Sequence, residues 1–157
     1  MSHSLPSPPN LLAPPPRLYL GCLALAMGLQ WFWPLPLGMP LNGRLALGIG
    51  LGGLSAALVR WAFATLRRAG TSGNPRQDSQ HLVRHGPFAW SRNPVYVAMT
   101  GLYASLAVLA DSAWPWWLLP SLLLAMHHGV IRREESYLLA RFGRPYADYL
   151  QQVRRWL

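Results

Sequence analysis

Long apolar stretches limit the folds available to this chain more than any other feature of its sequence. A helix that crosses a bilayer needs about 20 mostly apolar residues. Four stretches approach or exceed this length, and Arg60 is the only formally charged residue within them. They span residues 18–41, 45–66, 95–110 and 113–131, and the last two are separated by the turn Asp111-Ser112. The pattern predicts an all-α integral membrane bundle of about four transmembrane helices, with a connector and a C-terminal helical tail.

Two glycines in the second apolar stretch predict close helix packing. Gly48 and Gly52 are four residues apart, so they lie on the same face of a helix. Small residues at this spacing let two helix backbones approach closely inside a membrane. We therefore expect this helix to pack against a neighbour through that face.

The positions of the arginines predict the orientation of the chain in the membrane. The chain has 14 basic residues, all arginine, and five acidic residues, for a net charge of +9. The arginines concentrate in the connector after the second stretch and in the tail after the fourth, whereas the turns at 34–44 and 111–112 contain one between them. Basic loops stay in the cytoplasm. We expect both termini in the cytoplasm and a bacterial inner-membrane location; arginines placed between apolar stretches do not indicate a nucleic-acid partner.

The remaining segments set the expected domain boundaries. Residues 1–16 are rich in Pro and Ser, which predicts a disordered tail. Residues 17–157 are expected to form a single membrane domain. The tail after residue 131 is expected to be helical at each end and broken at "FGRPY". An apolar stripe in this tail fits either a helix in the membrane interface or a helix packed on the connector.

The connector contains an unusual group of polar and turn-forming residues, "HLVRHGPFAWSRNPVYVAM", at positions 81–99. Gly86-Pro87 and Asn93-Pro94 both disfavour helical backbone in the residue before the proline. Pro94 suits the first turn of the third helix, and Asn93 suits its N-cap. Two interpretations stay open, because irregular backbone near a membrane is either a plain interfacial loop or the lining of a cavity.

Glu134 and Glu135 form an acidic pair just beyond the fourth apolar stretch. One interpretation is a solvated helix face on which Arg132 pairs with Glu135, three residues away. The other is a carboxylate that faces a cationic ligand, because a carboxylate at a membrane boundary is costly to desolvate unless it is paired. Glu134 shares a helix stripe with Val130 and Leu138, which favours it as the residue that faces the bundle.

Metal and disulfide chemistry receive little support from the sequence. Cys22 is the only cysteine, so an intrachain disulfide is impossible. His127 and His128 are adjacent, and adjacent helical side chains point about 100° apart, which makes joint chelation difficult. The sequence has no Cys cluster and no HExxH motif, so we expect no metal site.

Two motifs together resemble those of the isoprenylcysteine carboxyl methyltransferase family and its bacterial, phospholipid methyltransferase-like relatives. They are "LVRHGPFAWSRNPVY" and, some 38 residues later, "EESYLLARFGRPYADYLQQVRRW". The resemblance covers about residues 80–157. It implies a small helical membrane bundle whose cytoplasmic half binds S-adenosylmethionine as methyl donor. The cofactor-binding residues that it implies are Gln80, His81, Leu82, Val83, Phe88, Asn93, Pro94, Val95, Tyr96, Glu134 and Glu135.

The chain departs from the family pattern at three positions. Asn93 stands where eukaryotic members have His, and Phe88 replaces a Tyr. Val130 stands where the carboxyl methyltransferases have a substrate-binding Arg, which leaves open whether Arg132 or Arg133 takes that role. The resemblance therefore implies a membrane methyltransferase with an apolar or lipid-like acceptor, methylated on O, S or N. The alternatives are an NADPH-dependent membrane reductase of related fold and a non-catalytic membrane scaffold.

Overall fold

A computed structural model describes residues 13–71 and 81–157, and within these residues the regular elements are all helices. The long helices are α1 (Pro15–Phe32), α2 (Leu41–Arg68), α3 (Pro94–Leu109) and α4 (Trp114–Met126). A short 3₁₀ helix, η1 (Gly86–Ala89), precedes α3, and a π-helical segment, η2 (His127–Ile131), joins α4 to α5 (Arg132–Phe142). The chain continues through α6 (Arg144–Gln152). The expected all-α class is thus confirmed for the described residues.

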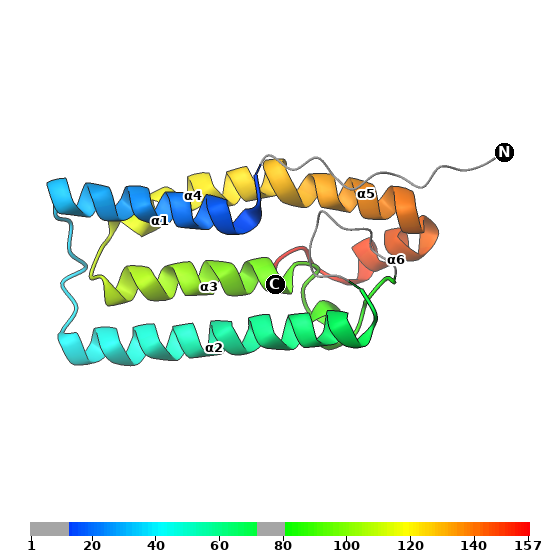
Figure 1. Ribbon diagram of the computed structural model, residues 1–157, viewed down its shortest axis with the longest axis horizontal. Coiled ribbons are helices and arrows are strands. Elements are labelled where there is room, and N and C mark those ends of the chain that lie inside the picture. The colour runs from blue at the N-terminus through cyan, green and yellow to red at the C-terminus, as the bar shows by residue number, and fades with distance from the viewer. Residues whose placement is uncertain (1–12, 72–80) are drawn as a thin grey trace.

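The four long helices lie roughly along one direction, and the shorter α5 and α6 extend the molecule at one end (Figure 1). Helix α2 packs mainly on α3, and α1 packs mainly on α4. Further contacts join α3 to α4 and α1 to α3, so the two pairs form one bundle. The connector and η1 pack against the end of α2 that is nearer to α6.

Helix boundaries follow the prolines, with one departure from expectation. Helix α3 begins at Pro94, as predicted, because a proline in the first turn loses no helical hydrogen bond. Helix α1 begins at Pro15, so the expected tail boundary at residue 16 was wrong for its last two residues; residues 1–12 lie outside the described part of the chain. Helix α1 ends at Phe32, earlier than the apolar stretch does, because the sequence that follows is rich in proline.

The expected four membrane spans are only partly supported. Among the described helices, α2, with 28 residues, is the one that is both long and apolar enough to cross a bilayer. Helix α3 is apolar but has 16 residues, and α4 has 13 because the backbone changes to π-helical hydrogen bonding at His127. The helical backbone nevertheless continues through η2 and α5 to Phe142.

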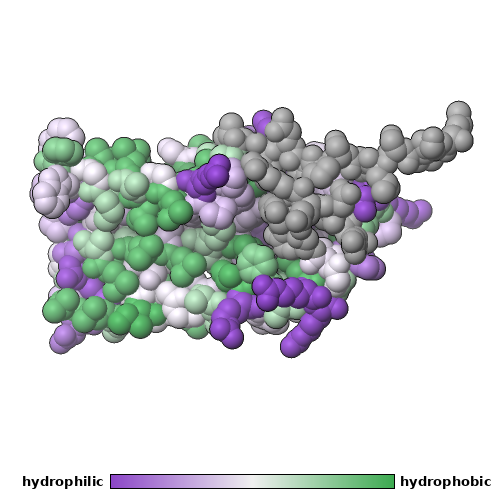
Figure 2. Space-filling view, viewed as in Figure 1, coloured by the Kyte–Doolittle hydropathy of each residue, from purple (hydrophilic) through white to green (hydrophobic). Residues whose placement is uncertain are grey.

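Apolar side chains cover much of the outside of the bundle, while several buried side chains are small or polar. Leu20, Ile49 and Leu54 are each more than 60% exposed, whereas Ser55 and Ser105 are buried. Figure 2 shows hydrophobic residues over much of the visible side of the helices and hydrophilic residues toward the two ends of the bundle. A soluble monomer rarely exposes apolar surface on this scale, so the distribution favours contact with lipid.

The close approach predicted for Gly48 and Gly52 is confirmed. A Cβ atom at Gly48 would lie 2.5 Å from Cγ of Leu109, and one at Gly52 would lie 2.8 Å from Oγ of Ser105. The Ser105 hydroxyl also donates a hydrogen bond of 2.7 Å to the Gly48 carbonyl. The C-terminal half of α3 therefore lies against the glycine face of α2.

Candidate functional site

A cavity of about 450 Å³ is lined by the connector, by the starts of α1 and α3, and by residues of α2, α5 and α6. Ten of the eleven residues that the sequence predicted as cofactor-binding line this cavity; Gln80, the eleventh, lies outside the described residues. The ten are His81, Leu82, Val83, Phe88, Asn93, Pro94, Val95, Tyr96, Glu134 and Glu135. The fold thus brings the connector motif and the acidic pair together, although what they bind remains a prediction.

The connector is held in shape by contacts with α2 and α6. Gly86 has a φ of 62°, which favours glycine, and a Cβ there would lie 3.1 Å from Oγ1 of Thr65 on α2. The hydroxyl of Tyr149 on α6 donates a hydrogen bond of 2.6 Å to the Phe88 carbonyl. At the start of the described connector, the His81 N–H donates to Oγ1 of Thr71 at 2.9 Å. The interpretation of the tail as packed on the connector is therefore confirmed for Tyr149.

Glu134 projects toward the cavity and meets Tyr96. The Tyr96 hydroxyl donates a hydrogen bond of 2.7 Å to Oε1 of Glu134. Burial raises the pKa of the Glu134 carboxyl to about 7, the hydrogen bond from Tyr96 opposes this rise, and the nearby Glu135 charge adds to it. Among the described residues Glu134 takes part in no ion pair within 4 Å. A cation bound in the cavity would therefore favour the ionised form of the Glu134 carboxyl group.

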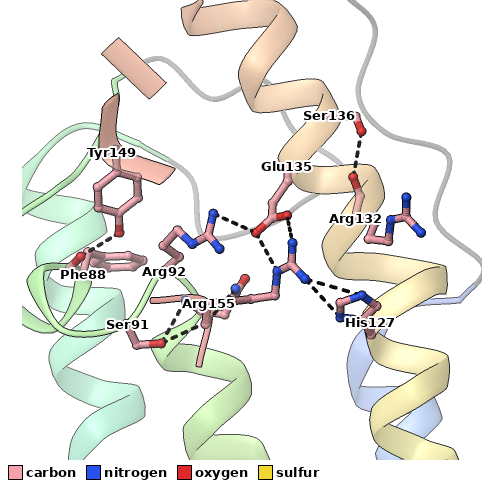
Figure 3. Close-up of polar contacts among 10 residues, drawn as sticks. Phe88, Ser91, Arg92, His127, Arg132, Glu135, Ser136, Tyr149 and Arg155 are labelled. Carbon is pink, nitrogen blue, oxygen red and sulfur yellow. Dashed lines mark hydrogen bonds and ion pairs between the residues drawn. The ribbon is translucent and has the colours of Figure 1, made fainter. Parts of the chain in front are cut away.

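Glu135 is bound by two arginines that come from distant parts of the chain. Arg155 contacts it through two nitrogens, with Nη2 at 2.7 Å from Oε2 and Nε at 3.0 Å from Oε1. Arg92 adds a third contact, Nη1 to Oε1 at 3.3 Å. Figure 3 shows both guanidinium groups directed at the same carboxylate. The prediction that Arg132 pairs with Glu135 was wrong, because a two-pronged guanidinium contact is stronger than an exposed pair along one helix.

Asn93 occupies the N-cap position of α3 but does not cap it with its side chain. Its Nδ2 donates a hydrogen bond of 3.0 Å to the carbonyl of Arg155, in the segment that follows α6. The position was thus predicted correctly, whereas the expected capping hydrogen bond was not. The asparagine instead joins the connector to residues 153–157.

Several cavity residues were missed at the sequence level. They are chiefly Arg92, Tyr137, Phe142, Tyr146 and Tyr149. Tyr146 and Tyr149 are three residues apart, so they share one face of α6, and this spacing was a usable signal. Burial raises the pKa of Tyr149 to about 12, which keeps its hydroxyl a hydrogen-bond donor at neutral pH.

The family's substrate-binding arginine has no counterpart at Val130, which is fully buried in the bundle. Arg132 and Arg133 are exposed and do not line the cavity. Among the described arginines, Arg92 is the one that lines it. The His127 and His128 rings meet edge to face, with centroids 4.7 Å apart. Within the described ranges no group of three His, Cys, Asp or Glu residues is arranged to hold a metal ion.

The fold and the cavity define a helical protein with an apolar exterior and an aromatic, carboxylate-bearing site at one end. Residues 43–145, about two thirds of the chain, match the family described as phospholipid methyltransferase. The chain belongs to this family, which is part of the isoprenylcysteine carboxyl methyltransferase-like group, so the resemblance of its two motifs is confirmed. Membership implies methyltransferase activity at a membrane.

A bacterial relative is similar over a shorter stretch. An uncharacterized protein of Haemophilus influenzae is 41% identical to this chain over 64 residues, which cover 36% of this chain and 100% of that protein. No solved structure matches the chain.

Proposed function

We propose that this protein is an integral membrane methyltransferase that uses S-adenosylmethionine to methylate an apolar or lipid-like acceptor. The observation that carries the proposal is the Glu134 carboxyl group, which lies in an aromatic-lined cavity, accepts a hydrogen bond from Tyr96 and has no cationic partner among the described residues. S-adenosylmethionine is a cation of suitable size for a cavity of about 450 Å³.

The residues present fit such a cofactor. Phe88, Tyr96 and Tyr146 offer aromatic surface, which favours a purine ring and a neighbouring positive charge. Glu134 supplies the negative charge that an ammonium or sulfonium group requires. When bound, S-adenosylmethionine supplies an electrophilic methyl group. The work of this chain is to hold and orient its ligands, because alignment at about 3–3.5 Å is the main requirement of such a transfer.

The acceptor is expected to enter from the apolar side of the cavity. Val59 and Phe63 of α2 and Met99 and Leu102 of α3 line that side. An amine, thiol or hydroxyl on an apolar molecule would have to lose a proton during transfer. The absence of an arginine at position 130 gives no support to a carboxylate acceptor.

We further propose four membrane spans with both termini in the cytoplasm of a bacterial inner membrane. The apolar exterior of the bundle supports this topology, as do the aromatic residues Trp31, Trp33 and Trp117 at its outer end, each at least 65% exposed. Tryptophans concentrate at membrane interfaces. At the other end, Arg67, Arg68 and Arg84 are exposed near the cavity, as the positive-inside rule requires for a cytoplasmic site.

Ligand binding to detergent-purified protein tests the proposed function. We expect S-adenosylmethionine and S-adenosylhomocysteine to bind, and NADPH not to bind. Binding of NADPH alone would support the reductase, and binding of neither would support the scaffold. A labelled methyl donor added to membrane lipid extract would then identify the class of acceptor.

A further inference from the structure

Residues 153–157, which follow α6, make a series of contacts with the cavity wall. The carbonyl of Arg154 accepts a hydrogen bond of 2.9 Å from the backbone N–H of Arg92. The carbonyl of Arg155 accepts from Nδ2 of Asn93 at 3.0 Å and from Oγ of Ser91 at 3.4 Å. Three consecutive connector residues are thus bound by two consecutive residues of this segment.

The Arg155 side chain ties the same segment to the other wall of the cavity. It holds the Glu135 carboxylate of α5 through two nitrogens, at 2.7 and 3.0 Å. Its Nη1 also lies 3.4 Å from the His127 ring nitrogens, so the guanidinium group lies between Glu135 and His127 (Figure 3). Arg155 is therefore the point at which the connector, α5 and η2 meet.

We propose that Arg155 is a positioning residue, which holds Arg92, Asn93 and Glu135 in the arrangement that the methyl donor requires. The inference rests on the proposed function. Arg155 does not line the cavity itself and lies outside residues 43–145, which match the family. It acts through Glu135, whose carboxylate it shares with Arg92, and through its own carbonyl group, which orients Asn93.

The charges explain why an arginine is needed at this position. Only a guanidinium group can make two parallel contacts with one carboxylate while a third nitrogen meets another group. Its side chain is 32% exposed, whereas that of Arg92 is 12% exposed, so Arg155 is the outer member of the three-residue cluster. With Arg155 fixed, Glu135 stays near Arg92, and the backbone of residues 91–93 has one defined position.

The test combines ligand affinity with hydrogen exchange in the full-length protein. Arg155→Gln should weaken S-adenosylhomocysteine binding by about five- to tenfold, because it removes a charge-assisted contact. Arg155→Lys should restore part of the loss. The control is Arg144→Gln, an equal loss of charge on an exposed side chain of α6, which should leave affinity unchanged.

A double variant separates positioning from a general loss of stability. If Arg155 acts through Glu135, the double variant Arg155→Gln/Glu135→Gln should bind S-adenosylhomocysteine as tightly as whichever single variant has the lower affinity. Additive losses, or no loss in Arg155→Gln, would overturn the proposal. Thermal midpoints of the ligand-free variants, measured alongside, should not follow the order of the affinities.

Hydrogen exchange provides a measurement that needs no ligand. The Arg92 amide, which donates to Arg154, should exchange about tenfold faster in Arg155→Gln, while amides within α2 stay unchanged. If wild-type protein bound no S-adenosylhomocysteine, the proposed function would fail, yet this measurement would still show whether Arg155 fixes the wall. Unchanged exchange at Arg92 would mean that it does not.

Discussion

Tyr96 and Glu134 are 38 residues apart in the chain, and the Tyr96 hydroxyl donates a hydrogen bond of 2.7 Å to the Glu134 carboxyl group. This contact joins the connector motif to the acidic pair. It also supports a prediction about charge. Glu134→Gln keeps the size and polarity of the side chain but removes its negative charge. We expect S-adenosylmethionine to bind about tenfold more weakly to this variant, which corresponds to about 1.4 kcal/mol.

The ligand series shows which positive group Glu134 meets. S-adenosylmethionine carries a sulfonium and an ammonium, S-adenosylhomocysteine only the ammonium, and 5′-methylthioadenosine neither. A loss shared by the first two ligands would assign Glu134 to the ammonium, and a loss confined to the first would assign it to the sulfonium. Equal affinities of wild type and Glu134→Gln for all three would contradict the charge role.

Tyr96→Phe isolates the hydroxyl of Tyr96 from its ring. We expect a loss of about threefold to tenfold in affinity, because the Glu134 carboxylate loses its hydrogen-bond donor. Tyr96→Ala also removes the aromatic contact and should lose a further 1–3 kcal/mol, roughly. Tyr103→Phe is the control, since its hydroxyl donates to the Pro115 carbonyl at 3.0 Å, away from the cavity. That control should change thermal stability and leave affinity intact.

The affinity for S-adenosylmethionine should depend on pH through Glu134. Burial raises the pKa of this carboxyl group to about 7, and a bound cation favours the ionised form. Below pH 7, binding must therefore release a proton, so affinity should rise toward pH 7 and level off above it. Calorimetry in buffers of different ionisation enthalpy measures this proton. A pH-independent affinity in wild type, or the same profile in Glu134→Gln, would contradict the assignment.

The same group should affect the stability of the ligand-free protein in the opposite direction. The folded chain holds the Glu134 proton more tightly than the unfolded chain, whose carboxyl has a pKa near 4.5. The stabilisation is therefore complete below about pH 4.5 and is lost as the pH rises through 7. Glu134→Gln should flatten this part of the curve of thermal midpoint against pH.

Neighbouring glycines on α2 provide a matched test of the helix contact. A Cβ at Gly52 would meet Ser105, whereas one at Gly53 would have no atom of another residue within 4 Å. We expect Gly52→Val to destabilise the protein by about 1–3 kcal/mol through overpacking. Gly53→Val is the matched control, because it introduces the same residue into the same helix. It should have a smaller effect, because its side chain would meet no neighbouring residue. Equal thermal midpoints for the two variants would show that α2 and α3 are not closely packed at this point.

Membrane topology can be tested with reporters that are active on one side of the membrane. A fluorescent protein fused after Leu157 should be active, because we expect that end in the cytoplasm. Alkaline phosphatase inserted at residues 36–38, in the outer turn, should also be active, because it would reach the periplasm. The reverse result at either site would contradict the four-span arrangement.

The sequence was most informative where local chemistry determines the structure. Pro94 predicted the start of α3, and Gly48 and Gly52 predicted the α2 contact. The stripe that contains Glu134 predicted that this residue turns inward, although Glu135 also lines the cavity. The cavity residues of the connector and the acidic pair came from the two family motifs. Their assembly around one cavity depends on tertiary contacts such as the hydrogen bond between Tyr96 and Glu134.

The contacts of Glu135 could not be predicted, because they depend on where distant segments return. Arg155 is 20 residues from Glu135, and Arg92 is 43 residues from it, so helical spacing favoured the nearer Arg132. Burial decides between such partners, and burial is set by tertiary packing. The length of α4 was misjudged for a related reason, since apolar composition does not indicate a change to π-helical hydrogen bonding.

The π-helical segment His127–Ile131 also bears on how this chain can evolve. A π-turn holds one more residue than an α-helical turn, so removing one residue returns the backbone to the α-helical repeat. Deleting one residue there, for example Gly129, would restore regular α-helix and rotate α5 by about 100°. Glu134 would then leave Tyr96, although neither residue had been substituted. In a relative that lacks one residue in this segment, the carboxyl group that contacts the tyrosine would have to come from a neighbouring position of the helix.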